Sequence, residues 1–230
     1  MNSKIPIRCM MFDFGSVIGH FDTPRYLKFI KRHQGNSLSF ENFFHGECLN
    51  VLKNYDLGLL SDLDFFKEIK RIFKLDGVGQ ELFFWIWGDI IWPDWDMVAI
   101  RDGLKEKGLE TVLISNMNTF HAGYIRRRYP RCLDNFSYKL ISAHEGVAKP
   151  DPEAWIRPMK ILGRRAEECL FIDDQISNIE VATNLGIAVW HYNVNDDNFC
   201  LNGKLDNERK EFKDYIRLLE ESGWIARPVK

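Results

Sequence analysis

The stretch MFDFGSVIGHFD, residues 11–22, places an acid directly after an apolar run. Residues 6–12, PIRCMMF, have the length and the apolar character of a buried strand, and Asp13 follows them at once. A carboxylate that is buried without a partner costs free energy, so its position at the end of a strand calls for a chemical reason. Gly15 stands two residues later, where a second acid would have been useful. We therefore expect Asp13 to meet a positive charge or a bound cation.

The composition is that of an ordinary water-soluble protein. The 230 residues can form one large domain or one domain with a smaller inserted one, and 28% of them are charged, with a net charge of −2. This balance gives no broad basic face for nucleic acid. The apolar run near the N-terminus is too short for a signal peptide or a membrane span, which predicts a cytoplasmic protein.

The cysteines are odd in number and form no C-x-x-C pair, so we expect reduced, mostly buried thiols at Cys9, Cys48, Cys132, Cys169 and Cys200.

Residues 20–93 have a helical pattern throughout. Thr23 is expected to cap a helix that begins at Pro24, because Thr accepts hydrogen bonds from the first turn and Pro suits the first helical position. Ser61 is expected to cap a second helix that reaches Leu75. The block is unusually aromatic, and it ends with the tryptophans Trp85, Trp87 and Trp92.

After Asp94, predicted helices and strands alternate along the chain. Pro158 lies inside a predicted helix over residues 152–162 and is expected to kink or divide it. The segment after Asn193 is expected to be a loop. The other expected elements are a helix over 95–107, strands over 111–115, 138–142 and 169–173, a helix that ends at Leu185, a strand over 187–192 and a helix over 206–222.

This alternation predicts an α/β fold, because strands separated by helices form a parallel sheet that is covered on both faces. We expect a doubly wound, Rossmann-like parallel sheet as the core, formed by residues 1–19 and 94–230. The helical block, residues 20–93, is then an all-helical cap inserted after the first strand.

Polar residues follow three of the predicted strands. The carboxyl ends of parallel strands share one edge of the sheet, where open α/β folds bind ligands. Carboxylates that meet there repel one another, and a hard, oxygen-liganded ion such as Mg²⁺ would offset that repulsion. The residues concerned are Asp13 after the first strand, Ser115 and Asn116 after the second, and Asp173 and Asp174 after a later one.

Lys149, in AKPDP, adds a positive charge on a proline-anchored loop just before a helix. An ammonium, a hydroxyl from Ser115 and backbone amides that face the Asp13 carboxylate would form a phosphate site with a nucleophile inside it.

These four segments, in this order, resemble the four motifs of the haloacid dehalogenase-like (HAD) hydrolase superfamily. The motifs are Asp13, LISN with Ser115, KPD with Lys149, and FIDDQISN with Asp173 and Asp174. The resemblance covers nearly the whole chain. YDLGLLSDLDFF, SNMNTFH and FIDDQISNIEVATNLGI resemble the subfamily with a small helical cap, and within it the sugar-phosphate phosphatases typified by α-D-glucose-1-phosphate phosphatase.

The resemblance implies a Mg²⁺-dependent phosphatase that acts on a small phosphorylated metabolite. Asp13 would attack phosphorus and become an aspartyl-phosphate, which water then hydrolyses. Ser115 and the backbone amide of Asn116 would hold the transferring group, while Lys149 would balance its charge. The resemblance also implies that Mg²⁺ is held by the Asp13 carboxylate, the Gly15 carbonyl oxygen and Asp174, with Asp173 as a direct or water-mediated ligand and Asn178 fixing the loop.

Gly15 departs from the usual superfamily pattern, which has a second Asp there as the acid and base. Such a group contributes ~10² to 10⁴ in rate, so its absence should slow the hydrolysis of ordinary alkyl phosphates. Sugar 1-phosphates lose less, because an anomeric hydroxyl is more acidic and leaves more readily without a proton. Asp22 or a metal-bound water is a candidate for the missing role, and Asp22 is equally well placed to cap the helix at Pro24.

The cap is expected to set specificity by closing over the site. Candidates for substrate contact are His20, Arg25, His45 and the tryptophans over 85–92, although residues of these kinds are more often structural. His144 and Glu145 could line the entrance, but their position in a loop explains them equally well. Two other functions stay open: a weakly catalytic binding or regulatory protein, and a haloacid dehalogenase, which the Asp173 and Asp174 pair disfavours. We expect no nucleic-acid or membrane partner, and either a monomer or a homodimer.

Overall fold

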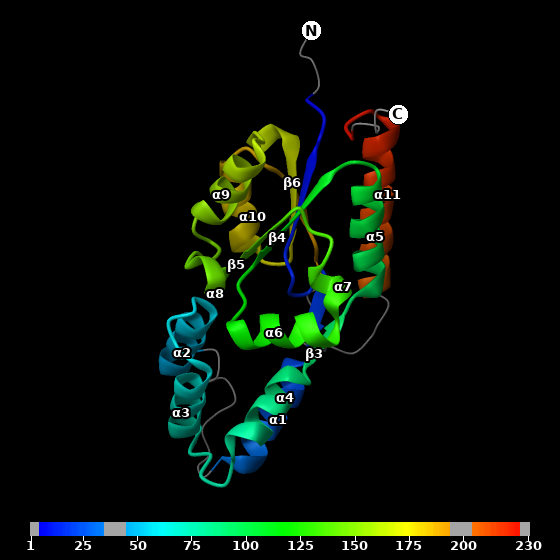
Figure 1. Cartoon of the computed structure of the whole chain (residues 1–230). Coiled ribbons are helices and arrows are strands. Elements are labelled where there is room, and N and C mark those ends of the chain that lie inside the picture. The colour runs from blue at the N-terminus through cyan, green and yellow to red at the C-terminus, as the bar shows by residue number, and fades with distance from the viewer. Residues whose placement is uncertain (1–4, 35–44, 194–203, 226–230) are drawn as a thin grey trace.

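A computed structural model describes residues 5–34, 45–193 and 204–225 (Figure 1). Its centre is a five-stranded parallel sheet with the strand order β5-β4-β1-β6-β7. The chain adds strands on one side of β1 and then returns to add strands on the other, which is the doubly wound arrangement predicted from the sequence. The strands are β1 (Cys9–Phe12), β4 (Glu110–Ser115), β5 (Tyr138–Ile141), β6 (Cys169–Asp173) and β7 (Ala188–His191).

Helices cover both faces of the sheet, as Figure 1 shows. Cys9 and Met11 pack in the core beneath α9 (Glu153–Leu162) and α10 (Ile176–Asn184). Met10 and Phe12 pack in the opposite core, beneath α5 (Trp95–Glu106) and α11 (Lys204–Glu221). Both faces of β1 are therefore apolar, which explains why its sequence shows no alternation of polar and apolar residues. The remaining core helices are α6 (Thr119–Arg128), α7 (Pro130–Leu133), α8 (Ser142–Glu145) and the 3₁₀ turn η2 (Ala166–Glu168).

The helix α9 continues through Pro158, so the expected division of this helix is wrong. Proline removes only one helical hydrogen bond, and the helix is held on both sides of it. Trp155 before the proline, and Met159 and Leu162 after it, pack into the same core beneath the sheet.

The cap contains four helices within the described residues, and they lie beyond one end of the sheet in Figure 1. Ser61 caps α3 as predicted, because its hydroxyl accepts a hydrogen bond from the Asp64 amide at 3.1 Å. The cap of α1 is Asp22 and not Thr23: Asp22 Oδ1 accepts from the Arg25 amide at 3.1 Å, and Thr23 is the first helical residue. The helices are α1 (Thr23–His33), α2 (Gly46–Asp56), α3 (Asp62–Phe73) and α4 (Gln80–Gly88).

A short antiparallel ribbon connects the cap to the core, so residues 20–93 are not wholly helical. It pairs β2 (Gly19–Phe21) with β3 (Ile91–Pro93), and His20 lies opposite Trp92. A side chain at Gly19 would place its Cβ 2.7 Å from the Phe14 ring, so only glycine permits this approach. Strands of three residues are too short to give a sequence period. The predicted domain boundaries fall within this ribbon or directly beside it, and they stay a prediction.

The ribbon is anchored to the core through Asp94, which caps α5 by accepting from the Met97 amide at 3.0 Å. His20 Nε2 lies 3.0 Å from Asp94 Oδ2, and Arg209 of α11 donates to the same oxygen at 2.9 and 2.7 Å. Burial opposes ionisation of Asp94, but the hydrogen bonds from His20 and Arg209 keep its pKa below the usual value. His20, a candidate for substrate contact, therefore has a structural partner.

We expect Asp94→Ala to lower the free energy of unfolding by about 3 kcal/mol, because it removes the cap of α5 and the buried acceptor shared by His20 and Arg209, while Arg209 keeps only the exposed Asp206 at 2.9 Å and Asp96 at 3.7 Å. Urea unfolding at neutral pH measures this change. Asp96→Ala is the matched control, since Asp96 approaches the same arginine at 3.7 Å with a side chain that is 58% exposed. Equal effects of the two substitutions would contradict the anchoring role of Asp94.

Cap and core also meet at His121, near the start of α6. Its Nε2 lies 2.9 Å from the carbonyl oxygen of Trp87 in α4, and its Nδ1 lies 3.3 Å from Asn118 Nδ2. These partners assign the proton to Nε2, which donates to the carbonyl, while Nδ1 accepts from the amide. Burial is the main reason that the pKa of His121 falls to about 4. The imidazole is thus neutral in the folded protein at neutral pH.

This histidine should make the protein sensitive to acid. Above pH 6.5, His121 is neutral in both the folded and the unfolded chain. Between pH 6.5 and 4, the unfolded chain binds a proton at this histidine and the folded chain does not. Stability is therefore lost as the pH falls, by up to about 3 kcal/mol. His121→Gln retains a donor for Trp87 but does not titrate, so urea unfolding at pH 7.5 and 4.5 should show a smaller loss than in the wild type. The exposed His33→Gln variant should lose as much as the wild type, and an unchanged loss in His121→Gln would refute this account.

The cysteines within the described residues, Cys9, Cys48, Cys132 and Cys169, are free and buried, as predicted. Cys200 and the loop expected after Asn193 fall outside the described residues. In the part of the chain that the structure describes, no helix combines the length and the apolar character that a bilayer span requires.

Candidate active site

Three carboxylates converge at the carboxyl edge of the sheet. Asp13 follows β1, Asp173 ends β6 and Asp174 comes next, and one ligand atom from each lies within 4.8 Å of the others. The strands β1 and β6 are neighbours where the order of strand addition reverses, the point at which open α/β sheets bind ligands. Asp173 is fully buried, Asp13 is buried and Asp174 is partly exposed. The expected convergence of the strand ends is thus present.

Lys149 bridges two of these carboxylates. Its Nζ lies 2.7 Å from Asp13 Oδ1 and 2.6 Å from Asp173 Oδ2, and the lysine side chain is only 2% exposed. Burial disfavours the ammonium, but Asp13 and Asp173 outweigh that effect and raise the pKa of Lys149. The lysine therefore stays charged. One ammonium cannot balance three carboxylates, so the site retains a negative charge that suits a divalent cation.

Asp13 is fixed in place by the backbone as well as by Lys149. Its amide donates to the Ile172 carbonyl at 2.9 Å, and its Oδ1 accepts from the Phe14 amide at 2.6 Å. Burial raises the pKa of Asp13 to about 8; Lys149 opposes this shift, and Asp173 and Asp174 add to it. A divalent cation bound among the carboxylates would reverse the shift by favouring the ionised form.

The hydrogen bonds distinguish Asp173 from the other two acids, Asp13 and Asp174. Asp173 Oδ1 accepts from the Gln175 amide at 2.7 Å, and Asn178 Nδ2 donates to both Asp173 oxygens at 3.0 and 3.1 Å. Together with Lys149, these donors occupy both oxygens of Asp173. Asp174 accepts from Gln175 Nε2 at 3.2 Å and is partly open to solvent. Carboxylate oxygens of this kind fit Mg²⁺, and Asp174 and Asp13 are more accessible to it than Asp173.

Asn116 connects the loop after β4 to the loop that carries Lys149. Its Nδ2 donates to the Lys149 carbonyl at 2.8 Å, and its Oδ1 accepts from the Lys149 amide at 2.9 Å. The sequence pointed to the Asn116 backbone amide and missed this role of the side chain. The available signal was a side-chain amide directly after Ser115. Ser115, buried at the end of β4, lies at the same edge of the sheet.

Neither the backbone conformation nor a lack of space for a Cβ requires a glycine at position 15. Its φ is outside the left-handed region, and a Cβ there would lie 3.7 Å from Asp13 Oδ2 and 3.7 Å from the Phe21 ring, which are ordinary contacts. Neither the backbone nor the space for a Cβ therefore explains the glycine, so the lack of an acid here is a chemical property of the site. Phe21, which comes from β2 and borders this space, is a residue that the sequence did not single out.

Other candidates from the sequence have partners away from the carboxylates. Asp22 caps α1, and Arg25 pairs with Asp89 on the cap surface. Glu145 pairs with Arg157 at 3.1 Å. In the aromatic block, Trp85 is exposed on α4 while Trp87 is buried. Of the remaining candidates, His45 precedes α2, Trp92 lies in β3 and His144 lies in α8.

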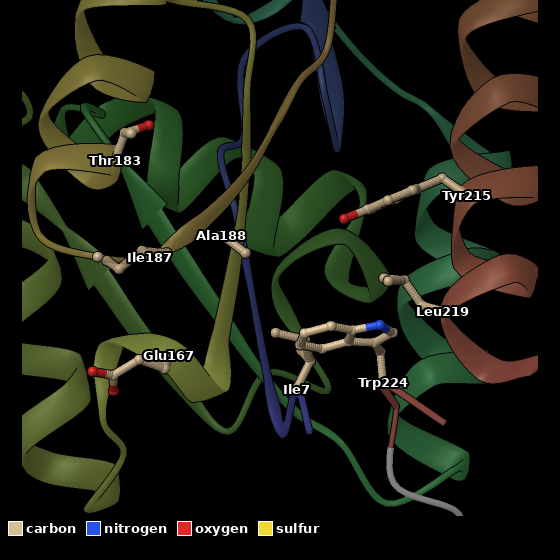
Figure 2. A pocket seen from close by; sticks show the side chains of 9 residues that line it. Ile7, Glu167, Thr183, Ile187, Ala188, Tyr215, Leu219 and Trp224 are labelled. Atoms are coloured by element: carbon tan, nitrogen blue, oxygen red, sulfur yellow. The ribbon is translucent and has the colours of Figure 1, made fainter. Parts of the chain in front are cut away.

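A cavity of about 630 Å³ lies at the opposite edge of the sheet, near the amino ends of the strands (Figure 2). In Figure 2 the Trp224 ring lies beside Ile7, below Tyr215 and Leu219 of α11. Among its described lining residues there is one acid, Glu167, and no lysine or arginine, so this cavity does not suit a phosphate. It is lined by Ile7, Glu167, Thr183, Gly186, Ile187, Ala188, Tyr215, Leu219 and Trp224.

The family model of haloacid dehalogenase-like hydrolases matches residues 7–186. That range includes both sheet strands of the carboxylate cluster, Lys149 and the whole cap. The chain therefore belongs to the haloacid dehalogenase-like hydrolase family.

Known proteins resemble this chain in fold and in part of its sequence. A HAD family enzyme of Bacteroides thetaiotaomicron, solved with magnesium and inorganic phosphate, superposes with a TM-score of 0.71 at 23% identity over 83% of this chain and 96% of the other. A glyceraldehyde 3-phosphate phosphatase of Pyrococcus furiosus is 29% identical over 120 residues, 49% of this chain and 45% of that protein. Acyl-CoA dehydrogenase family member 10 of Mus musculus is 33% identical over 84 residues, 36% of this chain and 8% of that protein. The chain thus spans less than half the length of these curated relatives.

Proposed function

We propose that this protein is a Mg²⁺-dependent phosphatase that hydrolyses a small phosphorylated metabolite through an aspartyl-phosphate on Asp13. The observation that carries the proposal is the cluster of three carboxylates within 4.8 Å, with Lys149 buried between two of them. The partial sequence similarity to a glyceraldehyde 3-phosphate phosphatase supports the same reaction class.

In this proposal an oxygen of the Asp13 carboxylate attacks phosphorus. The bond from phosphorus to the leaving oxygen breaks, and the leaving group takes the electron pair. Water then attacks the phosphorus of the aspartyl-phosphate, the bond from phosphorus to the Asp13 oxygen breaks, and inorganic phosphate leaves. The proton that the water gives up balances the one that the leaving oxyanion takes from solvent. Lys149 remains beside Asp13 and offsets the charge of the phosphoryl oxygens, while Ser115 and the Asn116 backbone amide orient them. The reaction mainly needs positioning and charge neutralisation, which these groups supply.

The proposed ligands of Mg²⁺ are the Asp13 carboxylate, the Gly15 carbonyl oxygen and Asp174. Asp173 would contact the ion directly or through water, and its hydrogen bonds with Lys149 and Asn178 favour the water-mediated arrangement. When bound, the ion would offset the charge of the carboxylates and of the phosphoryl group.

The leaving group is proposed to be more acidic than a simple alcohol, with a sugar 1-phosphate as the favoured substrate. Gly15 supplies no proton, although a Cβ at this position would make only ordinary contacts. Asp22 is the alternative proton donor. Its side chain accepts a hydrogen bond from the Arg25 amide as the cap of α1, which favours a structural role for Asp22. An anomeric oxygen needs less protonation to leave, so it suits a site with Gly15.

The test is to incubate the purified protein with a panel of phosphorylated metabolites and measure the release of phosphate with and without Mg²⁺. We expect Mg²⁺-dependent release that is fastest with an anomeric phosphate. Absence of release from every substrate and from p-nitrophenyl phosphate would favour a binding or regulatory protein. Release of halide from a haloacid without release of phosphate would favour a dehalogenase, in which the paired acids Asp173 and Asp174 have no evident role.

A further inference from the structure

Asp56, the last residue of cap helix α2, contacts the core at two places, the loop after β4 and the start of α8. Its Oδ1 accepts from Asn118 Nδ2 at 3.0 Å, and its main-chain oxygen accepts from the Ser142 hydroxyl. Asn118 lies in the loop after β4, and Ser142 is the first residue of α8, directly after β5, so one cap residue contacts the segments that follow two neighbouring strands. In Figure 1 the end of α2 lies next to α8, where Ser142 is the first residue.

The turn after Asp56 is shaped for this contact. Gly58 has a φ of +73°, and a Cβ at this position would lie 2.4 Å from the Ala143 carbonyl oxygen. Both the backbone conformation and the close approach require glycine here. The turn between α2 and α3 is therefore pressed directly against α8.

The contacted loop after β4 carries Asn116 and directly follows Ser115, two of the proposed phosphate-binding residues. Asn118 is three residues after Ser115, and the Ser142 hydroxyl also accepts from the Met117 amide at 2.9 Å. In the same loop, Asn116 holds the backbone of Lys149 on both sides. Hydrogen bonds thus join Asp56 to Asn118 and, through Ser142, to Met117, which both follow Ser115 in the same loop. Asn116, which lies between them and Ser115 in the chain, is bonded to Lys149.

Asn118 extends the connection to a second cap helix. Its side chain accepts from the His121 amide at 2.8 Å, and its second amide hydrogen is directed to His121 Nδ1 at 3.3 Å. His121 in turn donates to the Trp87 carbonyl of α4. Asn118 therefore bonds directly to Asp56 of α2 and is connected through His121 to Trp87 of α4.

We propose that Asp56, acting through Asn118 and Ser142, is a positioning residue that couples the docking of the cap to the geometry of the loop that carries Ser115. Its catalytic consequence rests on the proposed phosphatase function. The docking itself does not, because the contacts join cap and core whatever the substrate. A cap that loses Asp56 should separate more easily from the core, and the Ser115 loop should then become less ordered.

The experiment compares Asp56→Ala with Asp56→Asn in the full chain. The alanine variant removes the acceptor for Asn118 and should lower kcat/KM about tenfold through one lost hydrogen bond. The asparagine variant keeps a side-chain oxygen that accepts from Asn118, so it should stay within about twofold of the wild type. Asp76→Ala, at an exposed position after α3, is the matched control and should behave as the wild type.

Hydrogen exchange provides a readout that is independent of turnover. With Mg²⁺ and inorganic phosphate present, Asp56→Ala should speed amide exchange at least about tenfold in α2, α3 and residues 115–119, but not in β1 or β6. Faster exchange confined to these segments supports the coupling even if the wild type releases no phosphate, in which case only the proposed function fails. Unchanged exchange in Asp56→Ala, a uniform rise across the core, or an asparagine variant that behaves as the alanine variant would overturn the proposal.

Discussion

Replacement of Asp13 by Asn is expected to lower Mg²⁺-dependent phosphate release by about 10⁴-fold or more, because an amide is a poor nucleophile for phosphorus. The fold should survive the change. The substitution removes a buried carboxylate whose pKa is already raised, while Lys149 keeps Asp173 as a partner at 2.6 Å. The loss should therefore appear in kcat and not in stability.

Initial rates with p-nitrophenyl phosphate, together with urea unfolding of both proteins, measure this effect. Asp151→Asn is the matched control, since Asp151 is exposed on the same loop as Lys149 and should leave the rate unchanged. An Asp13→Asn protein that is folded and keeps more than about 1% of the wild-type rate would show that another group is the nucleophile.

Gly15→Asp is expected to raise kcat/KM for an alkyl phosphate such as glycerol phosphate by about 10²-fold, because it restores a proton donor beside the leaving oxygen. The backbone permits the change, because Gly15 is not among the glycines with a positive φ, and the new Cβ meets Asp13 and Phe21 at 3.7 Å. A substrate whose leaving group is already acidic, such as p-nitrophenyl phosphate, should gain little.

Gly15→Asn separates acid catalysis from shape, because it adds a side chain of the same size without a titratable proton. The ratio of kcat/KM for the alkyl phosphate to that for the aryl phosphate should rise in the Asp variant alone. If both variants change this ratio equally, the missing acid does not explain the selectivity of the site.

The sheet and the cluster of acids were predictable from the sequence because each depends on a local pattern. The strand over Cys169–Asp173 has the predicted bounds, since an apolar run ends abruptly in two acids there. The rule that parallel strands end at one edge then brings Asp13 to Asp173 without knowledge of any contact. Lys149 could likewise be placed at this edge, although its bridge between two carboxylates required the structure.

The contacts between cap and core were not predictable, because they depend on tertiary placement. Nothing local to Asp56 shows that Asn118 lies beside it, and the two are 62 positions apart in the chain. The β2 and β3 ribbon was missed since its strands have only three residues each. Phe21 lies beside Gly15 because the chain turns back on itself after Phe14, whose carbonyl accepts from the Ile18 and Gly19 amides. The domain boundaries, the cytoplasmic location and the oligomeric state stay predictions.

The central claim is that Asp13 carries the phosphoryl group, and chemical trapping tests it most directly. The wild type is mixed with p-nitrophenyl phosphate and Mg²⁺, quenched in acid during turnover and treated with borohydride, which reduces an acyl phosphate to an alcohol. Peptide mass spectrometry should then find homoserine at position 13 in the wild type, and neither in Asp13→Asn nor without Mg²⁺. Rapid release of phosphate with an unmodified residue 13, or with the reduced residue at another acid, would contradict the account.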